Sequence, residues 1–64
     1  MSILTQLKFH LRNTDYQETD YGLTVNNWKI YPGDDQKHAK AYRYSTVLII
    51  DSRNISQACD RMTK

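Results

Sequence analysis

The stretch from residue 41 to residue 52 reads AYRYSTVLIIDS, and it is the most apolar and most strand-like part of the chain. β-Branched and aromatic residues dominate it, as they do on pleated, half-buried surfaces. Its second half, residues 47–50, is apolar at every position, whereas a strand with a single covered face alternates apolar with polar residues. We therefore predict one central strand whose far end is covered on both sides.

A short amphipathic helix is expected directly after this strand. Residues 51–53 break the apolar run, and Asn54 followed by Gln57 approximates a capping box. The apolar residues that follow have the helical spacing i, i+3, i+4, i+7: Ile55, Ala58, Cys59 and Met62. Because so short a helix is marginal alone in water, its apolar stripe should dock on the preceding strand. The other face of the strand would then be covered by an N-terminal segment or by a second copy of the protein.

The N-terminal segment, residues 2–13, fits two patterns. Apolar and basic residues alternate as in a strand: Leu7, Lys8, Phe9, His10, Leu11 and Arg12. However, Leu4, Leu7 and Leu11 also share one face of a helix, and Leu, Gln and Lys favour helices. Phe9 is in phase with the strand and off the helical stripe, so we predict a strand. Lys8, His10 and Arg12 would then form an outer basic stripe that blunts edge pairing, or that binds an acidic partner.

Two turn signals divide the middle of the chain. Asn26-Asn27 suits the two-residue loop of a hairpin, because Asn tolerates positive φ; a bulge in one long strand over residues 21–31 is the alternative. Pro32-Gly33 suits a type II turn, and residues 33–40 form a polar loop. The sum is an α+β fold in one domain, residues 1–64: a small antiparallel sheet of three or four strands with the C-terminal helix packed on one face.

Size and composition restrict the function. A chain of 64 residues has a small core, and its single cysteine excludes a disulfide or a Cys-based metal site within one chain. Oligomerisation or partner binding is the remaining common source of stability. The net charge of +2 permits nucleic-acid binding without demanding it.

Signatures of chemistry and of membranes are missing from the sequence. His10, His38 and Cys59 do not stand at metal-ligand spacings, and no Gly-rich phosphate loop is present. We therefore predict neither an enzyme nor a cofactor or metal. No apolar run approaches the roughly 20 residues that span a bilayer, and the N-terminus does not resemble a signal peptide. We expect no membrane partner and a cytoplasmic location.

A basic and aromatic cluster is the main candidate site. It comprises Lys29, Tyr31, Lys37, His38, Lys40, Tyr42, Arg43 and Tyr44. Cations of this kind contact phosphates, and aromatic rings stack on bases or anchor protein interfaces; a solvated loop leading into a strand is the plainer interpretation. Five tyrosines and a tryptophan exceed what a small core can hide, so at least two should be exposed, with Tyr16 and one of Tyr42 or Tyr44 as our choices.

Three functional hypotheses follow. The favoured one is a non-enzymatic binding protein, a regulator or inhibitor of the kind that phages and mobile elements encode, which occludes a larger protein through an aromatic patch or an exposed strand edge. The second is a small nucleic-acid-binding module that uses the basic and aromatic cluster. A homodimer is compatible with either, and the apolar residues 47–50 motivate it.

Overall fold

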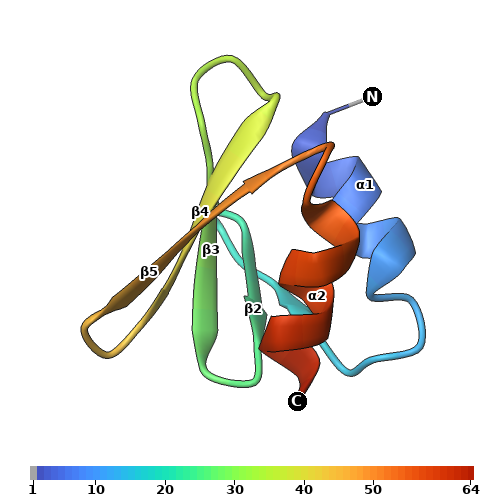
Figure 1. Cartoon of the computed structure of the whole chain (residues 1–64), viewed down its shortest axis with the longest axis vertical. Helices are drawn as coiled ribbons and strands as arrows, with labels where there is room; N and C mark the ends of the chain where they lie inside the picture. Colours follow the sequence, from blue (N-terminus) through green and yellow to red (C-terminus); the bar gives the residue numbers. More distant parts are fainter. Residues whose placement is uncertain (1) are drawn as a thin grey trace.

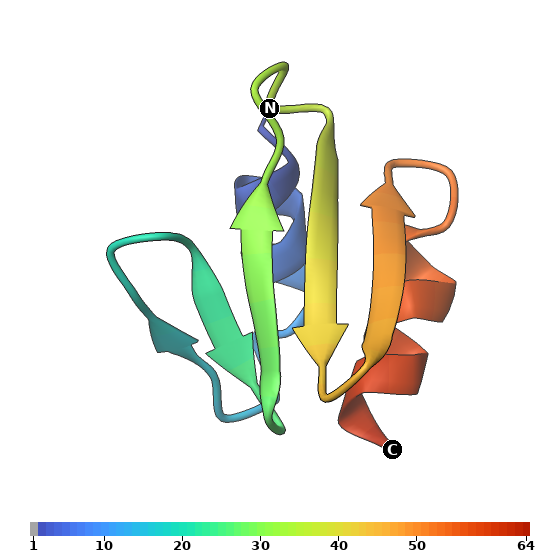
Figure 2. The ribbon, with the colours of Figure 1, turned by 90° about the vertical axis from the view of Figure 1, so that its left-hand side faces the viewer.

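Five antiparallel strands form one sheet in chain order, and two helices pack on one of its faces (Figure 1). The computed structural model describes residues 2–64. The elements are α1 (Ile3–His10), β1 (Gln17–Glu18), β2 (Leu23–Val25), β3 (Trp28–Pro32), β4 (His38–Arg43), β5 (Thr46–Asp51) and α2 (Ile55–Thr63). The α+β class and the C-terminal helix are confirmed, but the sheet has five strands rather than three or four. Figure 2 shows the sheet from the side that has no helix.

The predicted central strand is a hairpin. Strand β4 ends at Arg43, a turn at Tyr44 and Ser45 reverses the chain, and Arg43 pairs with Thr46 at the start of β5. Tyr44 has a φ of 56°, which is uncommon for a residue other than Gly, Asn or Asp. No Gly, Asn or Pro lies at this turn, so turn propensities do not predict it.

This hairpin also changes which side chains share a face. Leu48 and Ile50 turn towards the helices, whereas Val47 and Ile49 are 52% and 48% exposed on the other side. The expectation that this strand is covered on both sides was therefore wrong within a single chain. The N-terminal segment does not cover the second side, because α1 lies beside α2 on the same face.

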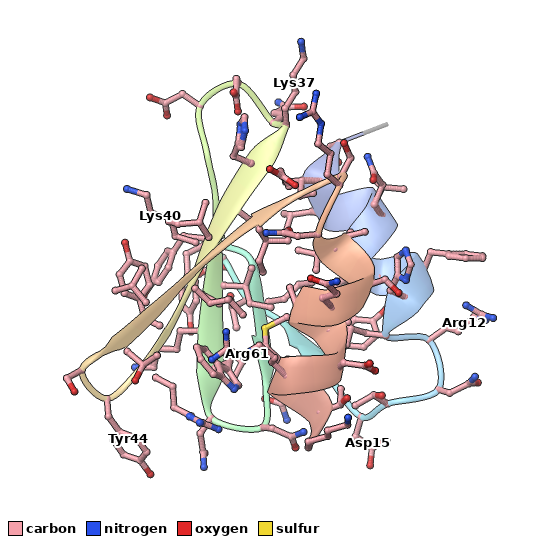
Figure 3. All side chains as sticks on the ribbon, viewed as in Figure 1. Arg12, Asp15, Lys37, Lys40, Tyr44 and Arg61 are labelled. Carbon is pink, nitrogen blue, oxygen red and sulfur yellow. The ribbon has the colours of Figure 1, made fainter. Side chains whose placement is uncertain are left out.

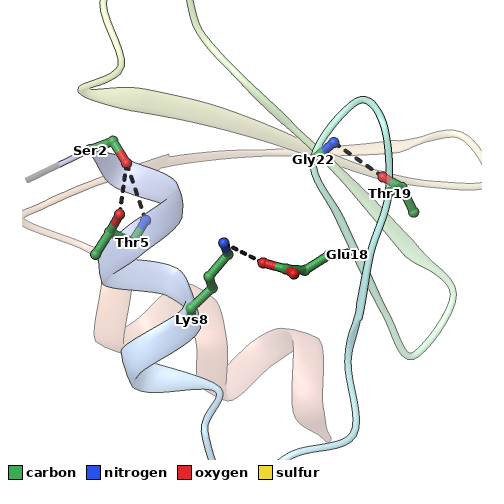
Figure 4. Close-up of polar contacts among 6 residues, drawn as sticks. All are labelled: Ser2, Thr5, Lys8, Glu18, Thr19 and Gly22. Atoms are coloured by element: carbon green, nitrogen blue, oxygen red, sulfur yellow. Dashed lines mark hydrogen bonds and ion pairs between the residues drawn. The ribbon is translucent and has the colours of Figure 1, made fainter.

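The N-terminal segment is a helix, so the strand prediction was wrong. The Ser2 hydroxyl accepts a hydrogen bond from the Thr5 backbone N–H at 3.3 Å and caps α1 (Figure 4). Leu7 and Leu11 are fully buried, as the helical alternative required. Phe9 lies off that stripe and is 61% exposed, with the Arg12 guanidinium 4.4 Å from its ring centre. The phase of Phe9, on which the strand prediction rested, does not reflect burial, because the ring lies at the surface beside a cation.

Three predicted local features can be compared with the structure. The hairpin at Asn26-Asn27 is confirmed, with φ values of 49° and 71°, and the Asn26 side-chain amide donates to the carbonyl of Met62 near the end of α2. The type II turn at Pro32-Gly33 was wrong, because Gly33 does not have positive φ; Gln36, at 58°, supplies the left-handed residue of that loop. The polar loop is shorter than expected, since β4 begins at His38.

The core lies between the sheet and both helices. The predicted stripe of α2 is buried, and β4 contributes Ala39 and Ala41, whose small side chains let α1 approach the sheet. Trp28 is 2% exposed, and the Arg43 guanidinium lies 4.5 Å from its ring centre. The Trp28 Nε1 is buried without a hydrogen-bond partner among residues 2–64.

Two adjacent isoleucines test whether one face of the sheet is bare in solution. We expect Ile50→Ala to lower the free energy of unfolding by about 2–4 kcal/mol, because it leaves a cavity in the core. Ile49→Ala should cost less than about 1 kcal/mol, because only strand propensity and partial burial change. Chemical denaturation followed by circular dichroism measures both values. Equal losses would show that Ile49 is covered in solution.

Candidate interaction surface

The side of the sheet away from the helices, which we call the open face, carries a mixed aromatic, aliphatic and basic surface. Alternation along the paired strands places these side chains there: Thr24, Lys29, Tyr31, Lys40, Tyr42, Val47 and Ile49. Tyr21, just before β2, joins them by stacking on Tyr31. Their neighbours along each strand point into the core. In Figure 3 the labelled Lys40 points away from the helices. The open face is thus an uncovered surface of a sheet that is otherwise sealed by two helices.

Three tyrosines form a continuous aromatic band across the open face. The Tyr21 and Tyr31 rings stack with centroids 4.6 Å apart, and Tyr31 meets Tyr42 edge-on at 5.5 Å. Gly22 brings the chain before β2 close to β3, because a Cβ at this position would lie 2.1 Å from the Ile30 carbonyl oxygen. The Tyr21 hydroxyl also lies 3.2 Å from the Thr24 hydroxyl. Each ring of the band remains more than a third exposed.

Lysines alternate with the tyrosines on neighbouring strands. Lys29 lies directly opposite Tyr42, and Lys40 lies directly opposite Tyr31, so the two residue types form a checkerboard. Among the outward positions of β2 to β5, Asp51 holds the only carboxylate. Its Oδ1 accepts backbone hydrogen bonds from Arg53 and Asn54 at 2.9 and 3.0 Å. The centre of the open face is therefore positively charged.

The open face is hollowed beside the β3–β4 loop. A hollow of about 450 Å³ is lined by Tyr31, Pro32, Gly33, Asp34, His38, Ala39, Lys40 and Ile49. At its rim the His38 Nδ1 lies 3.0 Å from an oxygen of Asp35. The backbone N–H of Lys37 and the His38 side chain both hydrogen-bond this carboxylate and lower the pKa of Asp35. A shallower hollow of about 340 Å³ lies between Tyr31 and Tyr42.

The Asn54 side chain closes part of the free edge of β5. Its Oδ1 accepts from the backbone N–H of Asp51 at 2.8 Å, and its Nδ2 donates to the carbonyl of Ile49 at 2.9 Å. An added antiparallel strand would use the same two backbone groups. The prediction that Asn54 stands at the start of α2 is confirmed. The predicted capping box was wrong, because the Asn54 side chain makes no hydrogen bond to the first turn of α2. The other sheet edge, β1, is only two residues long.

Loss of the Asn54 side chain should weaken the fold and free the β5 edge. We expect Asn54→Ala to lower the free energy of unfolding by about 1–3 kcal/mol, because it removes two hydrogen bonds at a partly buried site. It should also increase self-association at high concentration. Thermal denaturation and light scattering measure the two effects, and Asn13→Ala, at an exposed asparagine, is the control. Indistinguishable behaviour of the two variants would contradict this role.

The structure brings four of the eight main candidate residues together on the open face: Lys29, Tyr31, Lys40 and Tyr42. A fifth, His38, lines the hollow beside them. The other three lie elsewhere. Lys37 is in the β3–β4 loop, Arg43 packs over Trp28 on the helix side, and Tyr44 is 92% exposed at the tip of the β4–β5 hairpin (Figure 3). Of the tyrosines chosen as exposed, Tyr42 and Tyr44 are confirmed, but Tyr16 is partly buried against the core.

The basic stripe at the N-terminus is not an edge-strand row. Lys8 forms an ion pair with Glu18 of β1, which raises the pKa of Lys8 (Figure 4). His10 meets the Phe9 ring edge-on at 5.9 Å, and Arg12 covers that ring. Lys8, His10 and Arg12 therefore each contact a side chain of α1 or β1. The candidate cluster omitted Tyr21, Val47 and Ile49. A turn placed at Tyr44-Ser45 would have put Val47 and Ile49 on the open face with Tyr42, whereas Tyr21 joins this face by stacking on Tyr31.

The described residues hold little that suggests chemistry. Within residues 2–64, no three His, Cys, Asp or Glu side chains are grouped as metal ligands are. Over the same residues, neither helix has the length and apolar character that crossing a bilayer requires. Burial raises the pKa of the Cys59 thiol to about 11, and the nearby Asp60 charge adds to the effect. A thiol in this state is a packing group rather than a nucleophile.

Thiol chemistry tests the burial of Cys59. At mildly alkaline pH we expect a disulfide reagent such as DTNB to modify the native protein slowly, because the thiol is both inaccessible and protonated. In concentrated guanidinium chloride the reaction should be complete within the mixing time. The release of thionitrobenzoate measures both rates. Fast modification of the native protein would show that α2 detaches readily from the sheet.

Comparison of the chain with models of protein families, with curated proteins and with solved structures finds no match.

Proposed function

We propose that the protein is a non-enzymatic binding protein that docks on a larger protein through the open face and occludes the surface it covers. The observation that supports this proposal is the aromatic band, continued by Val47 and Ile49, on a sheet face that no segment of residues 2–64 covers. We place this activity in the cytoplasm, where a single free cysteine is stable. A regulator or inhibitor of the kind that phages encode would act in this way.

The composition of the open face is that of an interface. Contiguous exposed apolar surface on a small domain commonly marks an interaction site. Tyrosine is enriched at binding hot spots because it buries a large area and keeps a polar tip. Here the rings of Tyr31 and Tyr42 lie centrally, Val47 lies opposite Tyr42, and lysines lie between them. Rigid strands hold these side chains, so little conformational entropy is lost on binding.

The face is a better docking site than either sheet edge. Asn54 already occupies backbone groups of Ile49 and Asp51 on the β5 edge, and β1 is too short to template a strand. Strand addition, the other mechanism we considered, would have to displace the Asn54 amide. We therefore favour side-chain docking over strand addition.

Nucleic-acid binding is the second candidate. Tyrosines beside lysines on an open sheet are the arrangement that several single-strand binders use. However, the open face has two central lysines, and Arg43, which was expected to add to them, packs against Trp28 on the other side. The Tyr21 and Tyr31 rings also stack on each other, so one face of each ring is not available to a nucleic-acid base.

Alanine substitution in the aromatic band tests the proposal. We expect Tyr31→Ala and Tyr42→Ala each to weaken capture of the partner from a lysate of the source cells by at least about tenfold, as truncation of a hot-spot residue does. Quantitative mass spectrometry of the captured proteins measures the loss. Tyr44→Asn is the matched control, because Asn accepts the left-handed backbone at this position and the ring lies off the open face.

Two results would count against this docking surface. One is undiminished capture by folded Tyr31→Ala and Tyr42→Ala variants, with folding checked by circular dichroism. The other is equal loss in the Tyr44→Asn control. Nuclease-sensitive capture with a steep salt dependence would favour the nucleic-acid alternative instead.

A further inference from the structure

We infer that the partner surface covering the open face is acidic: an apolar protein surface whose carboxylates pair with Lys29 and Lys40. This inference rests on the proposed function and names the chemistry of the partner. Docking on the aromatic band necessarily covers both lysines, because each lies directly across from a tyrosine of the band. These two lysines therefore give the docking surface of this chain its positive charge.

Both lysines are exposed, and neither forms an ion pair with a carboxylate in the part of the chain that the structure describes. The ion pairs among residues 2–64 are Lys8 with Glu18 and His38 with Asp35, and neither involves Lys29 or Lys40. An ammonium group that loses water without gaining an opposite charge costs several kcal/mol. A partner that buries the aromatic band together with both ammonium groups therefore binds more tightly when it presents anionic groups at both positions.

A second copy of the chain does not meet this requirement. Face-to-face packing of two open faces would bring four lysines together, two from each copy. Two carboxylates of each copy lie near these lysines. The Oδ1 atom of Asp51 already accepts the backbone N–H groups of Arg53 and Asn54, and Asp34 lies in the β3–β4 loop, at one end of the hollow rather than on the strands that carry the lysines. The open face is complementary to an acidic surface and not to itself.

The hollow beside the β3–β4 loop indicates where one carboxylate binds. Lys40 and His38 supply its basic groups, and Tyr31 and Ile49 supply its apolar walls. The His38 ring is already held by Asp35, so Lys40 is the free cation of this hollow. Asp34 lines the loop end and repels an anion from that side. An acidic side chain next to an apolar one fits this arrangement.

Carboxylates fit the open face better than a phosphate backbone does. The half of the face over β5 is formed by Val47 and Ile49, which offer aliphatic contact and no ring for a base to stack on. Two lysines give few phosphate contacts, whereas nucleic-acid binders gain affinity from many. Aliphatic contact beside isolated ammonium groups is the usual composition of a protein interface with a charged rim.

Charge removal on the open face is the first test. In a lysate of the source cells, the double variant Lys29→Gln/Lys40→Gln should capture its partner at least about tenfold more weakly, the loss expected when a buried ion pair loses one member. The matched control Lys37→Gln removes a lysine in the β3–β4 loop, outside the open face, and should change capture by less than about twofold.

Zero-length cross-linking is the second test. A carbodiimide joins a lysine amine only to a carboxylate that it already touches. We expect Lys29 or Lys40 to be joined to Asp or Glu of the captured protein, as peptide mapping by mass spectrometry will show. The pair of Lys8 and Glu18 should be joined within the chain, which confirms that the reaction worked.

The outcomes separate this inference from the proposed function. If the glutamine variant binds normally and no cross-link forms at either lysine, while Tyr31→Ala still abolishes capture, the acidic partner is refuted and docking through the open face stands. If the tyrosine variants also bind normally, both proposals fail. If the wild-type chain captures only nuclease-sensitive material, or nothing, both proposals fail as well.

Discussion

The fold depends on the packing of two helices on the same face of one sheet. A chain of 64 residues has only enough apolar side chains for a single core layer, and here α1 and α2 close that layer together. On the other side, the strands of the sheet form the boundary of the core. One face of the sheet must therefore meet water or a partner, and the residues on it are free to serve binding rather than folding.

The two faces of β4 and β5 show this division. Inward positions are small or aliphatic, with Ala39 and Ala41 beneath α1 and Ile50 beside α2. Outward positions carry Tyr42, Val47 and Ile49, which the core does not need. In a sheet with one solvated face, polar side chains are the ordinary choice for such positions. Large apolar groups at these positions support the interaction surface that we propose.

Sequence patterns predicted the elements whose signals are local. The stripe from Ile55 to Met62 fixed α2, and Asn26-Asn27 fixed a hairpin because asparagine accepts positive φ. The turn at Tyr44 was hidden, because tertiary pairing between β4 and β5 holds a tyrosine in a left-handed conformation that its own propensity disfavours. Four candidate residues of the open face were named from composition, but Val47 and Ile49 joined them only once this turn was known. The phase of Phe9 led to a strand prediction at the N-terminus instead of a helix, but this ring lies exposed at the surface beside Arg12 and so carries no information on the core.

Trp28 occupies the side of the sheet opposite the open face, beneath the Arg43 guanidinium, and its indole N–H has no hydrogen-bond partner among residues 2–64. As the single tryptophan, it dominates the intrinsic fluorescence of the molecule. Its emission therefore reports whether the layer between the strands and the helices is intact. A red shift of that emission would mark the entry of water into the core.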